Sequence, residues 1–464
     1  MPFEFVNNAI LDRRTRKLIR SQAAKGRNVG KRHPSRGRRA AAKAGIAESH
    51  YDKPKDSLVL QSRHVVFPTI ERQVGDSLSV FSLPVESTPG SRVIMQKAFA
   101  FLMSIPTMPK LGRIVNFTTA GSIWIQFWFV DEAYFHCAMA ASIAAKNMLT
   151  SSSENFSEGL RHLSHSLRIV NQRLSGEKAL SDTTLASVVA MLQYERMCGQ
   201  YHQSLVHFRG LQRMVELRGG ISQLRRDKPE LAQKIFRADL EFAIYLGSPT
   251  LFGVDELPST ATIDWLRKRF GTSRMSALLT LPLFMRLNPH MREIWIDIMN
   301  LTSFLNESDN DGIKMDGYEY HDTLILIGYR LVHIRPLDKD SCDGWKENSI
   351  HLGLLMLMAN FFLSILHQLP DLPLLRQRIE ALVLEEFIGD KEEEEVLLWI
   401  LFMAGITIPQ LTEDGHFMRR ISKVTISLNL QIWDDVHQIL SKFPWIKAIH
   451  ERPGNTLWNH LILI

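Results

Sequence analysis

Cysteine is scarce in this 464-residue chain, which holds three, Cys137, Cys198 and Cys342, far apart in the sequence. An odd, dispersed set without CxxC spacing excludes a disulfide framework and a cysteine zinc site, and it fits a reducing compartment. Catalytic signatures are missing as well, since no GxxxxGK[ST], GxGxxG, GxSxG or HExxH sequence occurs. The sequence therefore predicts no enzyme of a recognisable class, no catalytic residues, no cofactor and no metal site.

Long hydrophobic runs are also lacking. The most apolar stretch, LGLLMLMANFFLSIL at residues 352–366, has 15 residues and contains Asn360 and Ser364, whereas a membrane span needs about 20. We expect a buried helix there and no membrane association. The beginning of the chain, MPFEFVNNAILDRRTRK, has no apolar core of a secretory signal. An Arg-rich mitochondrial presequence stays an alternative, against which Glu4 and Asp12 weigh.

Acidic residues are absent from one segment, residues 13–43, which carries thirteen Lys or Arg side chains. Without these thirteen, the chain has 42 basic and 49 acidic residues, a formal charge of −7 instead of +6. The sequence pI near 9.1 thus reflects one short segment on a mildly acidic body. Such asymmetry indicates a basic arm rather than a basic surface.

Dense basic clusters serve in nuclear localisation or in contacts with nucleic acid. KRHPSRGRR at residues 31–39 has the character of an import signal, and the earlier cluster at residues 13–20 would allow a two-part signal. DNA contacts of the arm would go to phosphate, with little sequence preference. A solvated tail without a partner is the alternative. The predicted nuclear-localisation and nucleic-acid residues are Arg13, Arg14, Arg16, Lys17, Arg20, Lys25, Arg27, Lys31, Arg32, Arg36, Arg38, Arg39 and Lys43.

The part of the chain that follows the basic arm and linker has the residue pattern of successive helices. Leu160, Leu163, Leu167, Val170 and Leu174 recur every three or four residues and predict one buried helical face. Asp182 is expected to cap the next helix, whose buried side holds Leu185, Val188, Val189 and Leu192. After Gly199 a second helix with Leu205, Phe208, Leu211, Met214 and Val215 ends at Gly219-Gly220, which completes an αα-hairpin.

Later segments follow the same pattern. Asp390 and Glu393 have capping-box spacing, and VLLWILFMA follows until Gly405, where we expect the helix to end. Aromatics at residues 123–134, IWIQFWFVDEAY, are expected in the core, although they could line a ligand pocket. The sequence predicts an all-α fold, divided into a basic, largely disordered arm at 1–47, a linker at 48–95 and a helical domain at 96–464.

Three further features have structural rather than functional interpretations. His162 and His165 lie three apart on a helix without a carboxylate nearby, so we expect structural or surface histidines instead of a metal site. DNDGIKMDGYE at residues 309–319 fails as a calcium loop, because Ile313 and Lys314 stand where an oxygen ligand and glycine are required. The carboxylates at residues 392–395 suit a helix start, although an acidic interaction patch is the alternative.

Four stretches together resemble a known family. They are FEFVNNAILDRRTRKLIRSQAAKGRNVGK, DTTLASVVAMLQYERMCGQYHQSLVHFRGLQRMVELRGGISQL, EVLLWILFMAGI and QIWDDVHQILSKFPWIKAIHERPGNTLW. Their order and spacing are similar to the regulatory domain of the fungal zinc-binuclear-cluster transcription factors, the fungal-specific transcription factor domain superfamily. The resemblance implies a nuclear protein with an all-helical middle-homology domain, a multi-helix bundle of packed αα-hairpins. Nothing in this sequence matches the family's six-cysteine zinc cluster.

The sequence thus predicts a nuclear transcriptional regulator without a zinc cluster, controlling a metabolic or secondary-metabolite gene cluster. Its expected partners are importin and other transcription proteins, with weak or low-specificity DNA contacts through the arm. The alternative is a helical adaptor outside transcription, whose basic tail binds acidic partners. Whether a small effector binds is left open by the sequence.

Overall fold

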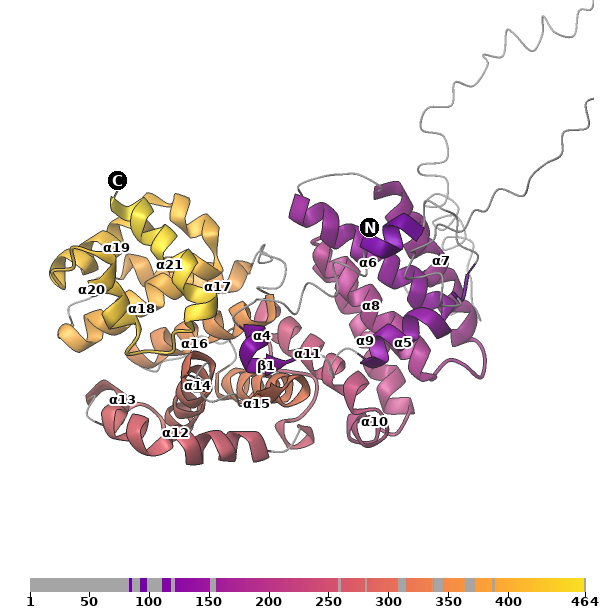
Figure 1. The fold of residues 1–464 in the computed structure, drawn as a ribbon, viewed down its shortest axis with the longest axis horizontal. Helices are drawn as coiled ribbons and strands as arrows, with labels where there is room; N and C mark the ends of the chain where they lie inside the picture. The colour runs from indigo at the N-terminus through magenta and orange to yellow at the C-terminus, as the bar shows by residue number, and fades with distance from the viewer. Residues whose placement is uncertain are drawn as a thin grey trace, which may run out of the picture. The chain divides into compact units, whose positions relative to one another are not determined.

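Helices make up almost all the regular structure of this chain (Figure 1). A computed structural model describes residues 83–85, 92–97, 111–117, 122–150, 156–257, 260–279, 282–307, 314–335, 337, 345–363, 372–385 and 389–462, which fall within one compact unit, Val80–Ile464. The elements in the first half are α4 (Leu111–Ile114), β1 (Val115–Asn116), α5 (Ser122–Val130), α6 (Glu132–Thr150), α7 (Phe156–Leu174), α8 (Asp182–Met197), α9 (Tyr201–Leu217), α10 (Ile221–Asp227) and α11 (Pro229–Leu246).

The second half continues in the same way. After the 3-10 turn η1 (Val254–Glu256) come α12 (Ala261–Leu279), α13 (Pro282–Arg286), α14 (Pro289–Glu307), β2 (Met315–Asp316), α15 (Gly317–Ile334), α16 (Trp345–Leu363), α17 (Pro373–Leu384), α18 (Lys391–Thr407), the 3-10 turn η3 (Pro409–Glu413), α19 (Gly415–Ser427), α20 (Trp433–Leu440) and α21 (Lys447–Ile462). The predicted all-α class is confirmed. The basic arm at 1–47 and most of the linker at 48–95 lie outside the described residues, and the division into arm, linker and domain stays a prediction.

Helices α8 and α9 form the predicted αα-hairpin and pack against each other. Gly199 and the Gly219-Gly220 pair have left-handed φ values of 70°, 98° and 89°, which glycine adopts without a Cβ penalty. One detail of the prediction is wrong. Ser181, not Asp182, caps α8, because its side chain accepts a hydrogen bond from the Thr184 amide at 3.3 Å. Asp182 instead pairs with Arg218 and Lys228 beyond the end of α9.

The buried face of α7 differs from the predicted leucine stripe. Leu160 is 42% exposed, whereas Val170 of the stripe and Ile169, which lies outside it, are buried. Ser166, fully buried, donates a hydrogen bond to the Ala133 carbonyl oxygen of α6 at 2.8 Å. A small side chain at the contact lets the two helix backbones approach closely, so the face that packs is set by α6 and not by the number of leucines.

Helix α18 lies at the centre of the C-terminal helices and packs against α16, α19, α20 and α21. Its Trp399, Ile400 and Phe402 are fully buried, as expected of a helix that is apolar all round. The capping box at its start is confirmed, since Asp390 accepts from the Glu393 amide at 2.9 Å and Glu393 accepts from the Asp390 amide at 3.3 Å. The acidic residues around this box are engaged structurally: Glu392 accepts from the Leu283 amide, and Glu393 and Glu395 pair with Lys346 and Lys442.

The predicted end of this helix at Gly405 is wrong, because α18 continues to Thr407. Gly405 is an interior residue, and a Cβ atom there would lie 2.7 Å from Leu457 Cδ2 of α21. The glycine therefore permits close packing of two helices and does not terminate one.

Other expectations about local structure hold within the described residues. Residues 352–363 lie in α16, and those at 352–361 are buried. Phe127, Trp128 and Tyr134 belong to the core. Asp316, from the calcium-loop-like stretch, pairs through β2 with β1 in parallel register and caps α15 by accepting from the Tyr318 amide at 2.8 Å. Residues 309–313 of that stretch lie outside the described residues. Among the helices described, none has the length and apolarity to cross a bilayer.

Candidate functional site: a pocket between α6 and α8

The site predicted from sequence is the basic segment, and all thirteen of its Lys and Arg residues lie outside the described residues. Their role stays a prediction. The structure instead draws attention to three places in the helical domain: a small pocket, a histidine cluster and a half-buried ionic cluster.

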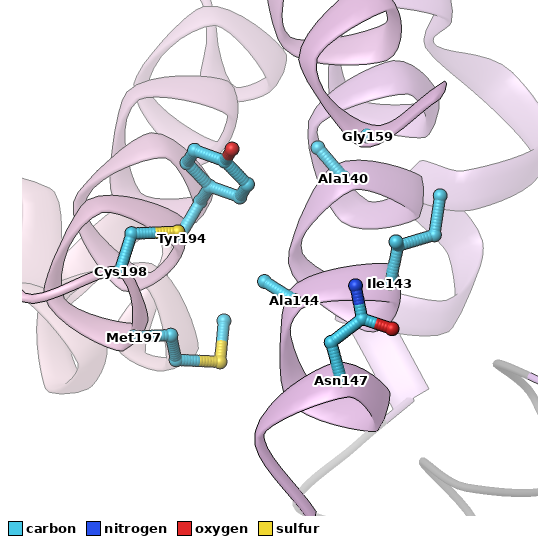
Figure 2. A pocket seen from close by; sticks show the side chains of 8 residues that line it. All are labelled: Ala140, Ile143, Ala144, Asn147, Gly159, Tyr194, Met197 and Cys198. Carbon is cyan, nitrogen blue, oxygen red and sulfur yellow. The ribbon is translucent and has the colours of Figure 1, made fainter. Parts of the chain in front are cut away.

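The pocket lies between α6 and α8, beside the start of α7, and has a volume of about 240 Å³ (Figure 2). Two runs of residues at helical spacing face it. Ala140, Ile143, Ala144 and Asn147 come from α6, whereas Tyr194, Met197 and Cys198 come from α8 and its end. Gly159 of α7 completes the lining. Figure 2 shows the Ala144 methyl and the Met197 side chain pointing toward each other from the two helices.

Small side chains create this space. Ala140 and Ala144 lie one turn apart on α6, and Gly159 has no side chain, so three of the eight lining residues extend no farther than a methyl group. Spacing at i, i+4 places the two alanines on the same helical face. Tyr194, Met197 and Cys198 line the pocket from the side of α8, so the size of the space depends on how α6 and α8 pack together.

The chemistry of the pocket is uncharged. Burial raises the pKa of the Tyr194 phenol and also that of the Cys198 thiol, so both groups keep their protons at neutral pH. A protonated thiol is a poor nucleophile and a poor metal ligand. Asn147 adds a carboxamide, whose Oδ1 is buried without a hydrogen-bond partner. The pocket can therefore receive an uncharged group that forms one or two hydrogen bonds. None of its lining side chains is an activated nucleophile or a general base.

The predicted pair of histidines belongs to a cluster of three. His162 of α7 lies with its Nδ1 atom 2.7 Å from Nδ1 of His136 on α6, and the His165 ring stacks on His136 at 5.0 Å between centroids. Burial, with help from neighbouring cationic groups, lowers the pKa of both His136 and His162 to about 4. The two imidazoles are thus neutral at pH 7, and in the contact between their Nδ1 atoms one ring donates and the other accepts. The sequence could not identify His136, because it precedes His162 by a whole helix.

The arrangement of these rings is structural. Two nitrogens 2.7 Å apart are closer than two ligands of one tetrahedral zinc ion, each at about 2.0–2.1 Å from the metal, can lie. Arg161 and Arg168 add positive charge beside the cluster. Within the part of the chain that the structure describes, no group of three or more His, Cys, Asp or Glu side chains has metal-binding geometry.

An ionic cluster joins α8 to α11. Glu241 accepts a hydrogen bond from Arg237 Nε at 2.7 Å and pairs with Arg196, and the two arginines hold its pKa below the usual value against the effect of burial. Lys234, one turn from Arg237, lies over the Trp124 ring at 5.9 Å from its centroid, and burial lowers its pKa to about 8. The cluster ties α5, α8 and α11 together.

Comparison with protein-family models matches residues 76–430 to the fungal specific transcription factor domain. The chain belongs to this family. The match covers more than half of the sequence and includes every element from α4 to α19. No curated protein and no solved structure matches the chain.

Family membership assigns the protein to the regulation of transcription, in a family that is regulatory and not enzymatic. The matched region stops at residue 430, yet α20 and α21 follow it and pack against α18. These last two helices are therefore part of the same hydrophobic core. The pocket, the histidine cluster and the ionic cluster all lie inside the matched region.

Proposed function

We propose that this member of the fungal specific transcription factor domain family is a nuclear regulator whose basic arm supplies nuclear entry and whose helical domain binds other transcription proteins. The observation that carries the proposal is the charge division within a chain of that family. Thirteen basic residues stand in one segment, and the remainder has a formal charge of −7. A basic segment of this density is attracted to an acidic import receptor and to nucleic-acid phosphates, whereas the acidic remainder of the chain is repelled by both.

DNA contacts, if the arm makes them, are electrostatic. Each neutralised phosphate releases counterions and contributes about −0.9 to the slope of log K against log salt concentration. Phosphate contacts position a protein on DNA without reading the bases. We therefore assign sequence selectivity to partner proteins and affinity to the arm, and we propose a metabolic or secondary-metabolite gene cluster as the target.

The helical domain offers surfaces suited to partners. Ile426 and Ile432 are 74% and 56% exposed, at the two ends of a short connection between α19 and α20. Beside that connection lies a polar pocket of about 550 Å³, lined among others by Lys391, Asp435 and Lys442. Apolar side chains next to charged groups are typical of protein–protein interfaces, which have an apolar centre and a polar rim.

Nuclear import is tested with the full-length protein fused to a fluorescent reporter. Replacing the six basic residues Lys31, Arg32, Arg36, Arg38, Arg39 and Lys43 by glutamine is expected to leave the fusion in the cytoplasm. The matched control changes the four arginines of this set to lysine, which keeps the charge and is expected to keep the protein nuclear. A glutamine variant that remains nuclear would refute the role of the arm in import.

DNA binding is tested by titrating the purified chain against a DNA duplex over a range of salt concentrations. If all six residues contact phosphates, the glutamine variant should show a slope shallower by about 5 than that of the wild type. Equal slopes would remove DNA from the functions of these six residues. Transcript profiling after deletion of the gene tests the target, since loss of one contiguous set of biosynthetic transcripts is the expected result.

A further inference from the structure

The pocket between α6 and α8 is not explained by the proposed nuclear role. Four of its eight lining residues, Ala144, Asn147, Met197 and Cys198, are partly exposed, so the pocket is partly open to solvent. A water molecule takes up roughly 30 Å³ of the liquid, so a pocket of about 240 Å³ has room for a molecule of roughly eight non-hydrogen atoms. This size lies just below the range of about 300–1,000 Å³ that is usual for drug-sized ligands.

The side chains that would fill the space are absent. On α6, Ala140 and Ala144 present methyl groups where a leucine would reach α8, and on α7 Gly159 presents none. A Cβ atom at Gly159 would lie 3.5 Å from Ile143 Cγ2, an ordinary contact distance, so the glycine is not required by a clash or by a left-handed φ. Because an alanine would fit and would favour the helix, packing alone does not account for glycine at this position.

The lining defines the class of guest. Ile143 and Met197 give apolar walls, and no charged side chain is among the lining residues that the structure describes. A charged guest would lose part of its hydration without gaining an ion pair, which is costly. At one end, Asn147 has an unpartnered buried Oδ1, and a carboxamide has two donors and two acceptor lone pairs to satisfy. The Tyr194 hydroxyl and the Cys198 thiol are further groups able to form hydrogen bonds.

We infer that this pocket is a binding site for a small, uncharged, apolar molecule that carries one hydrogen-bonding group. The guest fills the space between Ala144 of α6 and Met197 of α8, and its polar group lies toward the Asn147 carboxamide. Because the guest contacts both α6 and α8, its binding stabilises the packing of these two helices against each other. The inference concerns binding and stands independently of how the protein enters the nucleus or meets DNA.

The experiment is a calorimetric titration of the full chain with indole, an uncharged two-ring molecule of about nine non-hydrogen atoms, a size that small pockets bind efficiently. The wild type is expected to bind indole with a Kd below about 1 mM. Indole-3-acetate, which adds a carboxylate, should bind at least about tenfold more weakly because the lining offers the charge no partner.

Two variants locate the site, with one control on the same helix. Ala144→Leu places an isobutyl group in the pocket and should weaken indole binding at least about tenfold. Ala141→Leu makes the same change at a neighbouring, partly exposed alanine outside the lining and should bind like the wild type. Gly159→Ala adds a single methyl group at contact distance and should fold normally while it weakens indole binding by a smaller factor. If Ala144→Leu does not fold, the indole affinity of Gly159→Ala tests the location of the site.

Three results would overturn the inference. One is a wild type that does not bind indole in this range. Another is binding that neither Ala144→Leu nor Gly159→Ala weakens, since the molecule would then lie elsewhere. The third is indole-3-acetate binding as tightly as indole, which would exclude an uncharged site. A protein that passes these tests but leaves its reporter in the cytoplasm would refute the proposed nuclear function without affecting the pocket.

Discussion

Two glycines in helix interiors test whether the packing around α18 is as tight as the structure indicates. A Cβ atom at Gly353 of α16 would lie 2.6 Å and 2.9 Å from two ring atoms of Trp399 and 3.1 Å from Ile400 Cγ1. At Gly271 of α12, the described structure has no heavy atom within 4 Å of the same added atom. Gly353→Ala and Gly271→Ala are therefore the same chemical change in opposite surroundings.

Trp399 cannot easily move away from a new methyl group. Its indole is fully buried, its Nε1 donates a hydrogen bond to the Pro444 carbonyl oxygen at 3.1 Å, and its ring packs against Phe443 with centroids 5.8 Å apart. Overpacking in such a core costs about 1–3 kcal/mol. Replacing glycine by alanine inside a helix stabilises by roughly 0.5–1 kcal/mol. Gly353→Ala should thus be neutral to destabilising by up to about 2.5 kcal/mol, and Gly271→Ala should be stabilising by roughly 0.5–1 kcal/mol.

The measurement is urea denaturation of both full-length variants, followed by circular dichroism. The difference between their free energies of unfolding cancels the helix term and leaves the packing term, about 1–3 kcal/mol in favour of Gly271→Ala. If both variants shifted the free energy of unfolding equally, the close contact between α16 and α18 would be wrong. A Gly353→Ala protein more stable than the wild type would contradict the reasoning in the same way.

Two further predictions concern local chemistry. Burial lowers the pKa of His351 to about 4, although its hydrogen bond to the Leu331 carbonyl oxygen acts in the other direction. In the unfolded chain, His351 has a pKa near 6.5 and therefore binds a proton at a higher pH than in the folded protein. The contribution of His351 to the free energy of unfolding is thus fully present above pH 6.5, and about 3 kcal/mol of it is lost as the pH falls to 4. His351→Gln should flatten the pH dependence of unfolding between these values, and identical curves for the variant and the wild type would exclude His351 as the source. At the start of α18, Asp390→Ala should lower the free energy of unfolding by about 1 kcal/mol and Asp390→Asn by much less, because only alanine loses the side-chain acceptor for the Glu393 amide. Equal losses in thermal or urea unfolding would show that the cap is not the cause.

Local signals in the sequence predicted a good part of the helical framework. The hairpin of α8 and α9 was predictable because leucine periodicity and the Gly219-Gly220 stop are encoded within a few residues of each other. The capping box at Asp390 was predictable for the same reason. Predictions failed where a neighbour along the chain competes for one role, as when Ser181 caps α8 and leaves Asp182 to ion pairs.

The candidate site was not predictable from the sequence. Ala140, Gly159 and Met197 are ordinary helix residues until α6, α7 and α8 are packed, and the sequence does not state which faces meet. His136 and His162 are likewise 26 positions apart. The predicted site, the basic segment, came from charge counting alone and stays a prediction.

Composition and local periodicity determined, without any structure, that this chain is helical and carries its excess positive charge in one segment, and the resemblance of four stretches indicated a family of transcription regulators. Tertiary packing alone decided that Gly405 lies inside a helix, that Leu160 faces solvent and that a pocket remains between α6 and α8. The physical reason is range: a cap or a helical stripe involves residues within one or two turns, whereas the room beside a side chain depends on atoms from distant parts of the chain, such as Leu457 beside Gly405.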